Sequence, residues 1–174
     1  MILVDSNVII DVLTRDATWL TWSEAALIDA ADRDEIAINP IIYAELASGF
    51  ATIADLDDRI GAEAFRRLAL PYEAGFVAGR AFVEYRRRGG LRTSPLPDFY
   101  IGAHAAVAGL KLLTRDPRRY TSYFPKIALI TPDAWIDDNI FTISRSSIDV
   151  DLNSYFRVDR PVGQHRRAGR REPL

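Results

Sequence analysis

The sequence predicts an α/β fold, a three-layer α/β/α sandwich whose central sheet is mainly parallel. Short apolar runs that resemble buried strands alternate with longer helical segments along the chain, which is the order typical of parallel sheets. The first run, residues 1–4 (MILV), is apolar at every position, as strands buried on both faces are. With 174 residues, 48% of them hydrophobic, the chain is long enough to bury a core without disulfides or a structural metal.

The elements of the first half follow from local signals. After the strand at 1–4, the apolar spacing predicts helices over residues 7–13 and 20–32, and the run IAI predicts a strand over 36–38. Asn39 is a favourable N-cap, and Pro40 suits the first position of a helix that Gly49 ends. This order is strand, two helices, strand, helix.

The second half continues the alternation. Predicted helices and strands, in chain order, are a charged helix over 55–68, a strand at 68–70, a helix over 73–88, a helix that begins at Pro97, and strands over 111–114 and 128–130. Gly89 and Gly90 end the helix before Pro97, and residues 89–97 form a loop. The helix after Pro97 is rich in glycine and alanine, which lets it lie close to a sheet.

Composition divides the chain into a predicted domain over residues 1–137 and a C-terminal extension over 138–174. The extension lacks clear periodicity, and residues 160–174 hold five arginines with almost no apolar side chains. Such a segment is typical of chain that is flexible or bound to a partner. The formal net charge is −2, which argues against a protein that coats nucleic acid by bulk electrostatics.

Two features of the sequence bear on the compartment in which the protein is expected. The sequence contains no cysteine, which fits a reducing cytoplasm. The apolar start is interrupted at once by Asp5, so no signal peptide or membrane span is expected there. We therefore expect a cytoplasmic protein without a membrane partner.

Four acidic residues occupy positions where a surface acid is not expected. Asp5 follows the first strand directly, and Asp116 follows the strand at 111–114, so both are expected in the crevice at the carboxyl ends of the strands. Glu45 shares a helix face with apolar neighbours, and Asp98 lies in the first turn of an inward-facing helix. The four carboxylates are predicted to converge in one cleft.

A cluster of carboxylates is stable only when protons or cations neutralise it. Without cysteine, and with only two histidines, the ligands would be oxygen atoms, which suit Mg²⁺ or Mn²⁺. Acidic sites with these ions often serve phosphoryl transfer.

Three segments carry a resemblance to a known family. VDSNVIIDVL at residues 4–13, INPIIYAEL at 38–46 and LPDFYIGAHAAVAGLKLLTRDPRRYTSYFPKIALITP at 96–132 are similar to segments of PIN-domain ribonucleases, specifically the VapC-type toxins of bacterial toxin–antitoxin pairs. The resemblance runs from about residue 1 to residue 132. It leaves the segment beyond residue 138 outside the family pattern.

The resemblance implies a site and an activity. It makes Asp5, Glu45, Asp98 and Asp116 the catalytic and metal-binding acids, with Asn7 and Thr114 beside them. It also implies Mg²⁺- or Mn²⁺-dependent cleavage of RNA into products with 5′-phosphate and 3′-hydroxyl ends. A cognate antitoxin that blocks the cleft and a homodimer are the expected partners.

Other polar residues receive less specific interpretations. Asn7 and Thr114 are expected to orient a carboxylate rather than bind the metal. Asp11 is expected to be a solvated helix acid, and His104 a packed or surface histidine. The cluster Arg86, Arg87, Arg88 and Arg92 precedes the loop to Asp98 and could contact the RNA backbone.

Two rival functions remain open from the sequence. One is a non-catalytic PIN-like module that binds RNA or protein. The other is an aspartyl-phosphate phosphatase or receiver domain, which would require a second acid near Asp5, where the chain has Ser6 and Asn7. The four acids favour the nuclease over both rivals.

Overall fold

The computed structural model describes residues 1–61 and 63–132, so the predicted extension over 138–174 lies outside the described residues. The elements alternate between strand and helix as the sequence predicts. In chain order they are β1 (Ile2–Val4), α1 (Ser6–Thr14), α2 (Leu20–Arg33), β2 (Ile36–Ile38), α3 (Pro40–Ala47), α4 (Ile53–Ile60), β3 (Arg66–Arg67), α5 (Tyr72–Arg87), α6 (Pro97–Ala108), β4 (Lys111–Leu113), α7 (Arg118–Tyr123) and β5 (Leu129–Ile130).

The five strands form one parallel sheet in the order β3-β2-β1-β4-β5. Leu3 of the central strand lies opposite Ala37 of β2 on one side and Leu112 of β4 on the other. The strand order reverses at the β1–β4 junction, because β2 and β3 lie to one side of β1 and the later strands to the other. The carboxyl ends of strands at such a junction form the usual ligand crevice of an open α/β sheet.

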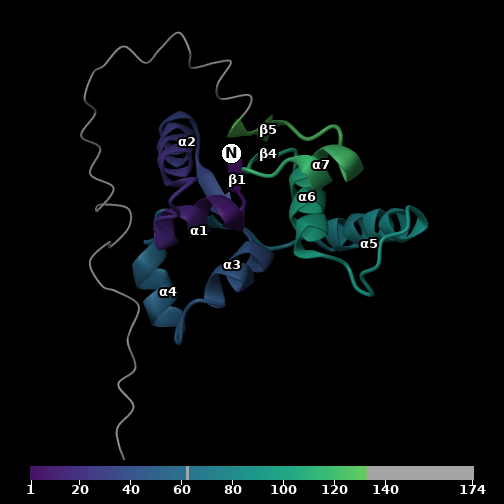
Figure 1. The fold of residues 1–174 in the computed structure, drawn as a ribbon, viewed down its shortest axis with the longest axis horizontal. Coiled ribbons are helices and arrows are strands. Elements are labelled where there is room, and N and C mark those ends of the chain that lie inside the picture. The colour runs from purple at the N-terminus through teal and green to yellow at the C-terminus, as the bar shows by residue number, and fades with distance from the viewer. Residues whose placement is uncertain (62, 133–174) are drawn as a thin grey trace, which may run out of the picture.

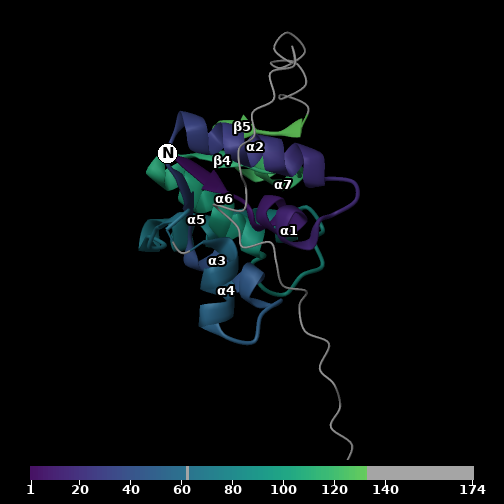
Figure 2. The same ribbon diagram turned by 90° about the vertical axis from the view of Figure 1, so that its left-hand side faces the viewer.

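Helices cover both faces of this sheet, which confirms the predicted three-layer α/β/α architecture. In Figure 1, α2 lies on one side of the sheet and α6 lies on the other, with α5 packed outside α6. Figure 2, which views the molecule from the α2 side, shows α2 in front of β4. The three residues of β1 are therefore buried on both faces, as their apolar sequence requires.

Small residues let α6 approach its neighbours closely. A Cβ atom added at Gly102 would lie 2.5 Å from the Phe124 ring, so this position accepts no larger residue without a shift of the ring.

His104, on the same helix, is buried, and its Nδ1 lies 3.1 Å from the Asn39 side-chain amide. Of the two settings expected for His104, packed or on the surface, the structure shows the packed one, and burial lowers the pKa of the imidazole.

The predicted elements differ from the observed ones around β3. The helix expected over 55–68 ends at Ile60, because Gly61 takes a backbone φ of 68° that does not continue a helix. The strand expected at 68–70 is instead Arg66–Arg67, two exposed residues on a sheet edge, where charged side chains are common. The short helix α7 was not predicted, and it follows β4 by only four residues.

Across residues 1–61 and 63–132, none of the helices combines the length and the apolar character that a membrane crossing requires.

Candidate functional site

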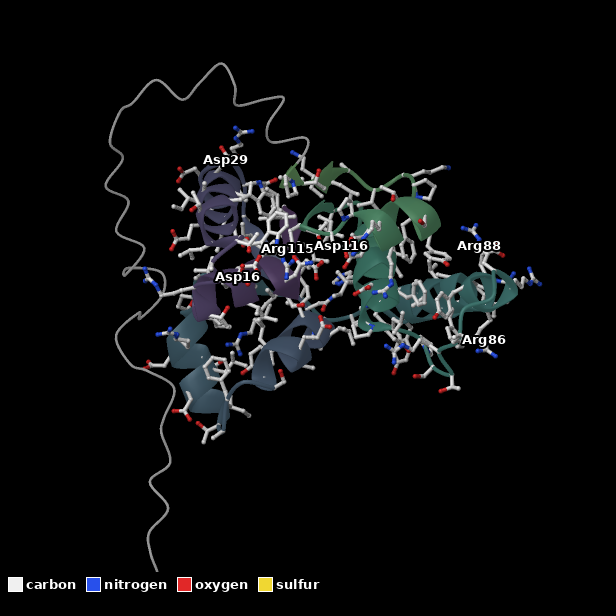
Figure 3. The ribbon with its side chains drawn as sticks, viewed as in Figure 1. Asp16, Asp29, Arg86, Arg88, Arg115 and Asp116 are labelled. Carbon is white, nitrogen blue, oxygen red and sulfur yellow. The ribbon has the colours of Figure 1, made fainter. Side chains whose placement is uncertain are left out.

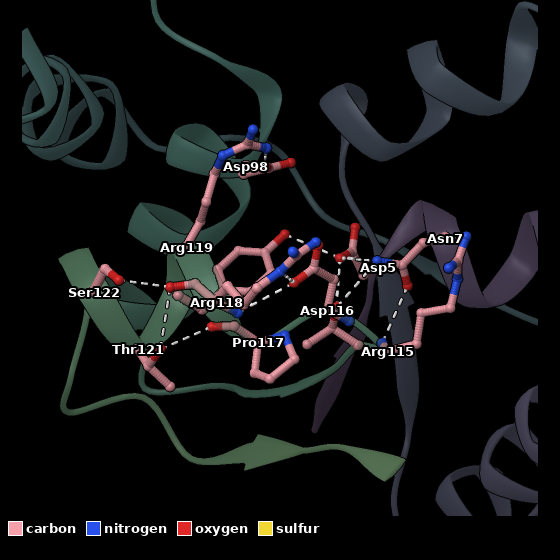
Figure 4. Close-up of polar contacts among 12 residues, drawn as sticks. Asp5, Asn7, Asp98, Arg115, Asp116, Pro117, Arg118, Arg119, Thr121 and Ser122 are labelled. Carbon is pink, nitrogen blue, oxygen red and sulfur yellow. Dashed lines mark hydrogen bonds and ion pairs between the residues drawn. The ribbon is translucent and has the colours of Figure 1, made fainter. Parts of the chain in front are cut away.

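The site is built around Asp5, where β1 ends beside β4. The Asp5 backbone N–H donates to the carbonyl of Leu113, which holds the two strand ends together. The Asp5 side chain is only 4% exposed, and its Oδ2 accepts three hydrogen bonds: from Asn7 Nδ2 at 2.8 Å, Thr114 Oγ1 at 2.8 Å and Tyr120 Oη at 3.0 Å. Figure 4 shows Asp5 and Asn7 of this group, whose members come from the end of β1, from α1, from the residue after β4 and from α7. The Asp5 carboxylate is thus fixed in one orientation.

The environment of Asp5 favours its protonated form. The pKa of Asp5 is raised from 3.8 to about 6, chiefly by burial and to a smaller extent by the charges of Asp98 and Glu45, while the hydrogen bonds from Thr114 and Tyr120 oppose the shift. Asp98 and Glu45 therefore lie near enough to Asp5 to act on its charge. A cation near these groups would relieve their repulsion.

Glu45 reaches the same region from α3. Its Oε2 accepts a hydrogen bond of 2.8 Å from Ser6 Oγ, at the start of α1. Burial raises the pKa of Glu45, and the charge of Asp98 adds to the shift. The predicted inward orientation of Glu45 agrees with these contacts, and Ser6 is an orienting residue that the sequence did not reveal.

Asp98 and Asp116 are each paired with an arginine of α7. Arg119 donates to Asp98, and Arg118 donates to both oxygens of Asp116 at 2.7 and 2.6 Å. The hydrogen bonds from Arg118 lower the pKa of Asp116. The Asp116 backbone N–H donates to Thr114 Oγ1 at 3.2 Å, which ties the loop after β4 to the Asp5 network.

The four predicted acids therefore lie around the carboxyl ends of the central strands, but their side chains are not arranged as a metal-binding site. Within the described part of the chain, no group of three or more acidic, histidine or cysteine side chains is arranged to hold a metal ion. Two of the carboxylates are turned toward arginines, and Oδ2 of Asp5 is already bound by three donors. The donor set is chemically suited to a hard cation, because it consists of carboxylate oxygens with a threonine hydroxyl beside them.

The structure corrects the prediction for Asp11. This residue is 1% exposed rather than solvated, accepts a hydrogen bond of 2.8 Å from Ser23 Oγ and lies 3.0 Å from Arg115 Nε. The Arg115 guanidinium also packs over the ring of Trp19. The sequence does not reveal this burial, because the apolar neighbours of Asp11 leave no distinct inward face on α1. Its polar partners come from distant segments, from α2 and from the loop after β4.

The arginines predicted to bind RNA include two at the outer end of α5, away from the acids. Figure 3 shows Arg86 and Arg88 near the outer end of α5, well apart from Asp116. Arg86 donates to the carbonyls of Gly90 and Arg92, and Arg88 pairs with Glu84. Arg87 lies 4.0 Å from the same glutamate. Their role in RNA binding remains a prediction.

Solved structures of similar fold come from toxin–antitoxin systems. They include VapBC2 from Rickettsia felis bound to a promoter DNA fragment (20% identity, TM-score 0.56, 75% of this chain and 98% of that chain). VapBC-1 from nontypeable Haemophilus influenzae matches at 18% identity and a TM-score of 0.57 over 75% of this chain and 98% of that chain. A toxin–antitoxin complex from Klebsiella pneumoniae matches at 24% identity and a TM-score of 0.51, over 76% of this chain and 98% of that chain. At these identities the likeness concerns the fold.

Comparison with curated protein sequences gives no match. The family model of the PIN domain, in contrast, matches residues 2–128, which is most of the chain and includes all four acids. The matched region begins with β1 and ends just before β5, and so it contains both strands of the β1–β4 junction and every residue of the Asp5 network. Sequence model and fold agree, and this chain belongs to the PIN-domain family.

Proposed function

We propose that this PIN-domain protein is a Mg²⁺- or Mn²⁺-dependent endoribonuclease that acts as the toxin of a toxin–antitoxin pair. The observation that carries the proposal is the buried Asp5 carboxylate at the β1–β4 junction, with Glu45 and Asp98 close enough to raise its pKa. Perturbed carboxylates at a switch point of a parallel sheet are typical of functional sites.

Asp5, Glu45, Asp98 and Asp116 are the residues that would hold the cation. When bound, Mg²⁺ or Mn²⁺ supplies positive charge to the phosphate oxygens and lowers the pKa of the attacking water. Asn7, Thr114 and Tyr120 fix Asp5 so that Oδ2 is committed to the protein and Oδ1 is free of these three donors. Preorganised carboxylates of this kind avoid the cost of ordering them during the reaction.

A direct test is the degradation of RNA by the purified chain during a titration with Mg²⁺ or Mn²⁺, followed by addition of EDTA. The proposal expects cleavage that rises with the cation, stops with EDTA and leaves 5′-phosphate and 3′-hydroxyl ends. RNA cleavage that continues unchanged in EDTA would contradict it.

The second candidate is a non-catalytic module that binds RNA or protein. The ion pairs that hold Asp98 and Asp116 favour this reading, because both acids already have cationic partners. The same titration separates the two functions, since the module would bind RNA without cutting it at any cation concentration.

The proposed partners are an antitoxin and a second copy of the chain. One of the similar folds is described as a toxin–antitoxin complex, and the acidic edge around Asp5 suits a partner that presents a basic side chain. Co-purification of a small protein that suppresses RNA cleavage would support the antitoxin. If cells that express the active chain alone grow normally, the antitoxin proposal is contradicted. Sedimentation of the purified chain as a monomer would contradict the homodimer.

A further inference from the structure

Two consecutive arginines of α7 lie at the acidic edge of the site. Pro117 precedes α7, and the first two residues of the helix, Arg118 and Arg119, reach Asp116 and Asp98 respectively. Figure 4 shows both side chains extending toward these acids from the same turn. Each of the two arginines therefore neutralises one of the carboxylates that the proposed function assigns to the cation.

These two ion pairs are open to solvent. The side chains of Arg118 and Arg119 are 85% and 52% exposed. Exposed ion pairs contribute little to stability, so a stronger competitor can replace one partner without unfolding the site. A divalent cation carries twice the charge of a guanidinium and would be such a competitor for the same oxygens.

Released guanidiniums would remain close to the substrate. The scissile phosphate has to approach the cation, and the cation would be held by the acids that Arg118 and Arg119 now contact. The planar guanidinium fork binds phosphate with the same bidentate geometry that Arg118 uses on Asp116. The charges of Asp98 and Asp116 both raise the pKa of Arg119, so Asp116 also lies near enough to act on this guanidinium.

The neighbouring arginine does not share this property. Arg115 packs over Trp19 and pairs with the buried Asp11, so its side chain is committed to the junction between α1 and α2. Arg118 and Arg119 are thus the arginines next to the site that can exchange their partners.

We propose that Arg118 and Arg119 form an exchangeable RNA-phosphate contact: they pair with Asp116 and Asp98 until a divalent cation binds, and then contact the RNA backbone. This inference rests on the proposed nuclease function. It makes the binding of cation and RNA mutually favourable, because the cation releases the groups that hold the RNA.

Arg119→Gln and Arg118→Gln test the exchange, with Arg33→Gln as the matched control. Arg33 also forms an exposed ion pair, to Asp29, but it lies just before the amino end of β2, whereas the site lies at the carboxyl ends of the strands. Calorimetric titration with Mn²⁺ should give a dissociation constant about two- to fivefold lower for Arg119→Gln than for the wild type, the range expected when an exposed ion pair no longer competes.

RNA binding should change in the opposite direction. With a phosphorothioate-linked RNA, confirmed intact on a gel, fluorescence anisotropy should show weaker binding by Arg119→Gln in Mn²⁺ and nearly unchanged binding in EDTA. In Mn²⁺ the salt dependence of log Kd should also decrease, by about 0.7 per lost phosphate contact. Arg118→Gln should behave alike, and Arg33→Gln should match the wild type throughout.

The outcomes separate the two proposals. If the wild type binds Mn²⁺ and cuts RNA but the Arg118 and Arg119 variants match Arg33→Gln, the exchange is wrong and the nuclease stands. Equal loss of RNA affinity in EDTA and in Mn²⁺ would also overturn the exchange. If Asp5→Asn binds Mn²⁺ as well as the wild type does and neither cuts RNA, the nuclease proposal fails and the exchange fails with it.

Discussion

The Thr114 hydroxyl donates a hydrogen bond of 2.8 Å to Oδ2 of Asp5, across 109 residues of sequence. The bond joins the ends of β1 and β4, the two strands between which the order of the sheet reverses. Thr114 is fully buried, and its Oγ1 also accepts from the Asp116 backbone N–H. One hydroxyl therefore orients the central carboxylate and the loop that carries another of the proposed acids.

Thr114→Val removes this hydroxyl while nearly preserving the shape of the side chain. The variant should lose about 1–3 kcal/mol in the free energy of unfolding, because the buried Asp5 carboxylate loses one of its three donors and the Asp116 N–H loses its bond to the hydroxyl. It should also raise the pKa of Asp5 above about 6, since the hydrogen bond from Thr114 opposes the shift. Urea denaturation and a carboxyl-carbon NMR titration measure the two effects.

Thr121→Val is the matched control. Thr121 is exposed on α7, and its hydroxyl bonds only to carbonyls of the preceding turn at 3.1 Å. Its substitution should change the free energy of unfolding by about 0.5 kcal/mol or less. Equal losses for the two variants would contradict the role given to Thr114.

Asp5 should make the protein less stable as the pH rises. Its folded-state pKa of about 6 exceeds the ordinary value of 3.8, so the folded chain retains a proton that the unfolded chain releases. The contribution of the Asp5 proton to the free energy of unfolding is fully present below pH 3.8. It declines as the pH rises through about 6 and is lost above that pH. The shift corresponds to about 3 kcal/mol.

Asp5→Asn tests this pH dependence without a cation present. The variant should lack the decline in unfolding free energy between about pH 4 and pH 6, whereas the wild type should show it in EDTA. Parallel curves for the two proteins, from denaturant melts at several pH values, would contradict the raised pKa of Asp5.

Asp11→Asn should destabilise the fold because it leaves the Arg115 guanidinium without its buried counter-charge. We expect a loss of about 1–3 kcal/mol, less than for a fully buried pair, since the Arg115 side chain is 32% exposed. Asp29→Asn breaks an exposed i,i+4 pair with Arg33 and should cost about 0.5 kcal/mol or less. Figure 3 shows the different settings of Asp29 and Arg115. Thermal melts that rank the two variants equally would refute the buried pair.

Tyr120→Phe removes only the hydroxyl that donates to Asp5 and keeps the buried ring. It should slow RNA cleavage by about fivefold, because one hydrogen bond of about 1 kcal/mol no longer orients the carboxylate. Single-turnover cleavage with saturating Mg²⁺ measures the effect. Unchanged cleavage would show that Asn7 and Thr114 suffice to orient Asp5.

The sequence predicted the features that depend on short-range patterns. The wholly apolar run before Asp5 identified β1 as a buried parallel strand, and Asn39-Pro40 located the start of α3, where Asn39 Oδ1 accepts from the N–H groups of Ile41 and Ile42. The alternation of strands and helices gave the fold class. Asp5 and Thr114 were placed correctly at strand ends because strand ends are visible in the sequence.

Contacts between distant segments could not be predicted in the same way. Tyr120 reaches Asp5 from α7, a helix of six residues without a strong apolar period, and nothing near Asp11 in the sequence indicates Ser23 or Arg115. The pairing of Asp98 with Arg119 spans 21 residues and depends on how α7 returns to α6. These relationships arise from packing, which no local pattern encodes.

The cleavage of RNA by Asp98→Asn in Mg²⁺ is the most direct test of the proposed nuclease. The Asp98 side chain is 26% exposed and pairs with the more exposed Arg119, so the substitution should leave the fold intact while removing one of the cation's proposed ligands. Asp29→Asn, which makes the same change on α2, is the control. We predict that Asp98→Asn folds normally and does not cleave RNA, whereas Asp29→Asn cleaves as the wild type does. Undiminished cleavage by folded Asp98→Asn would contradict the account.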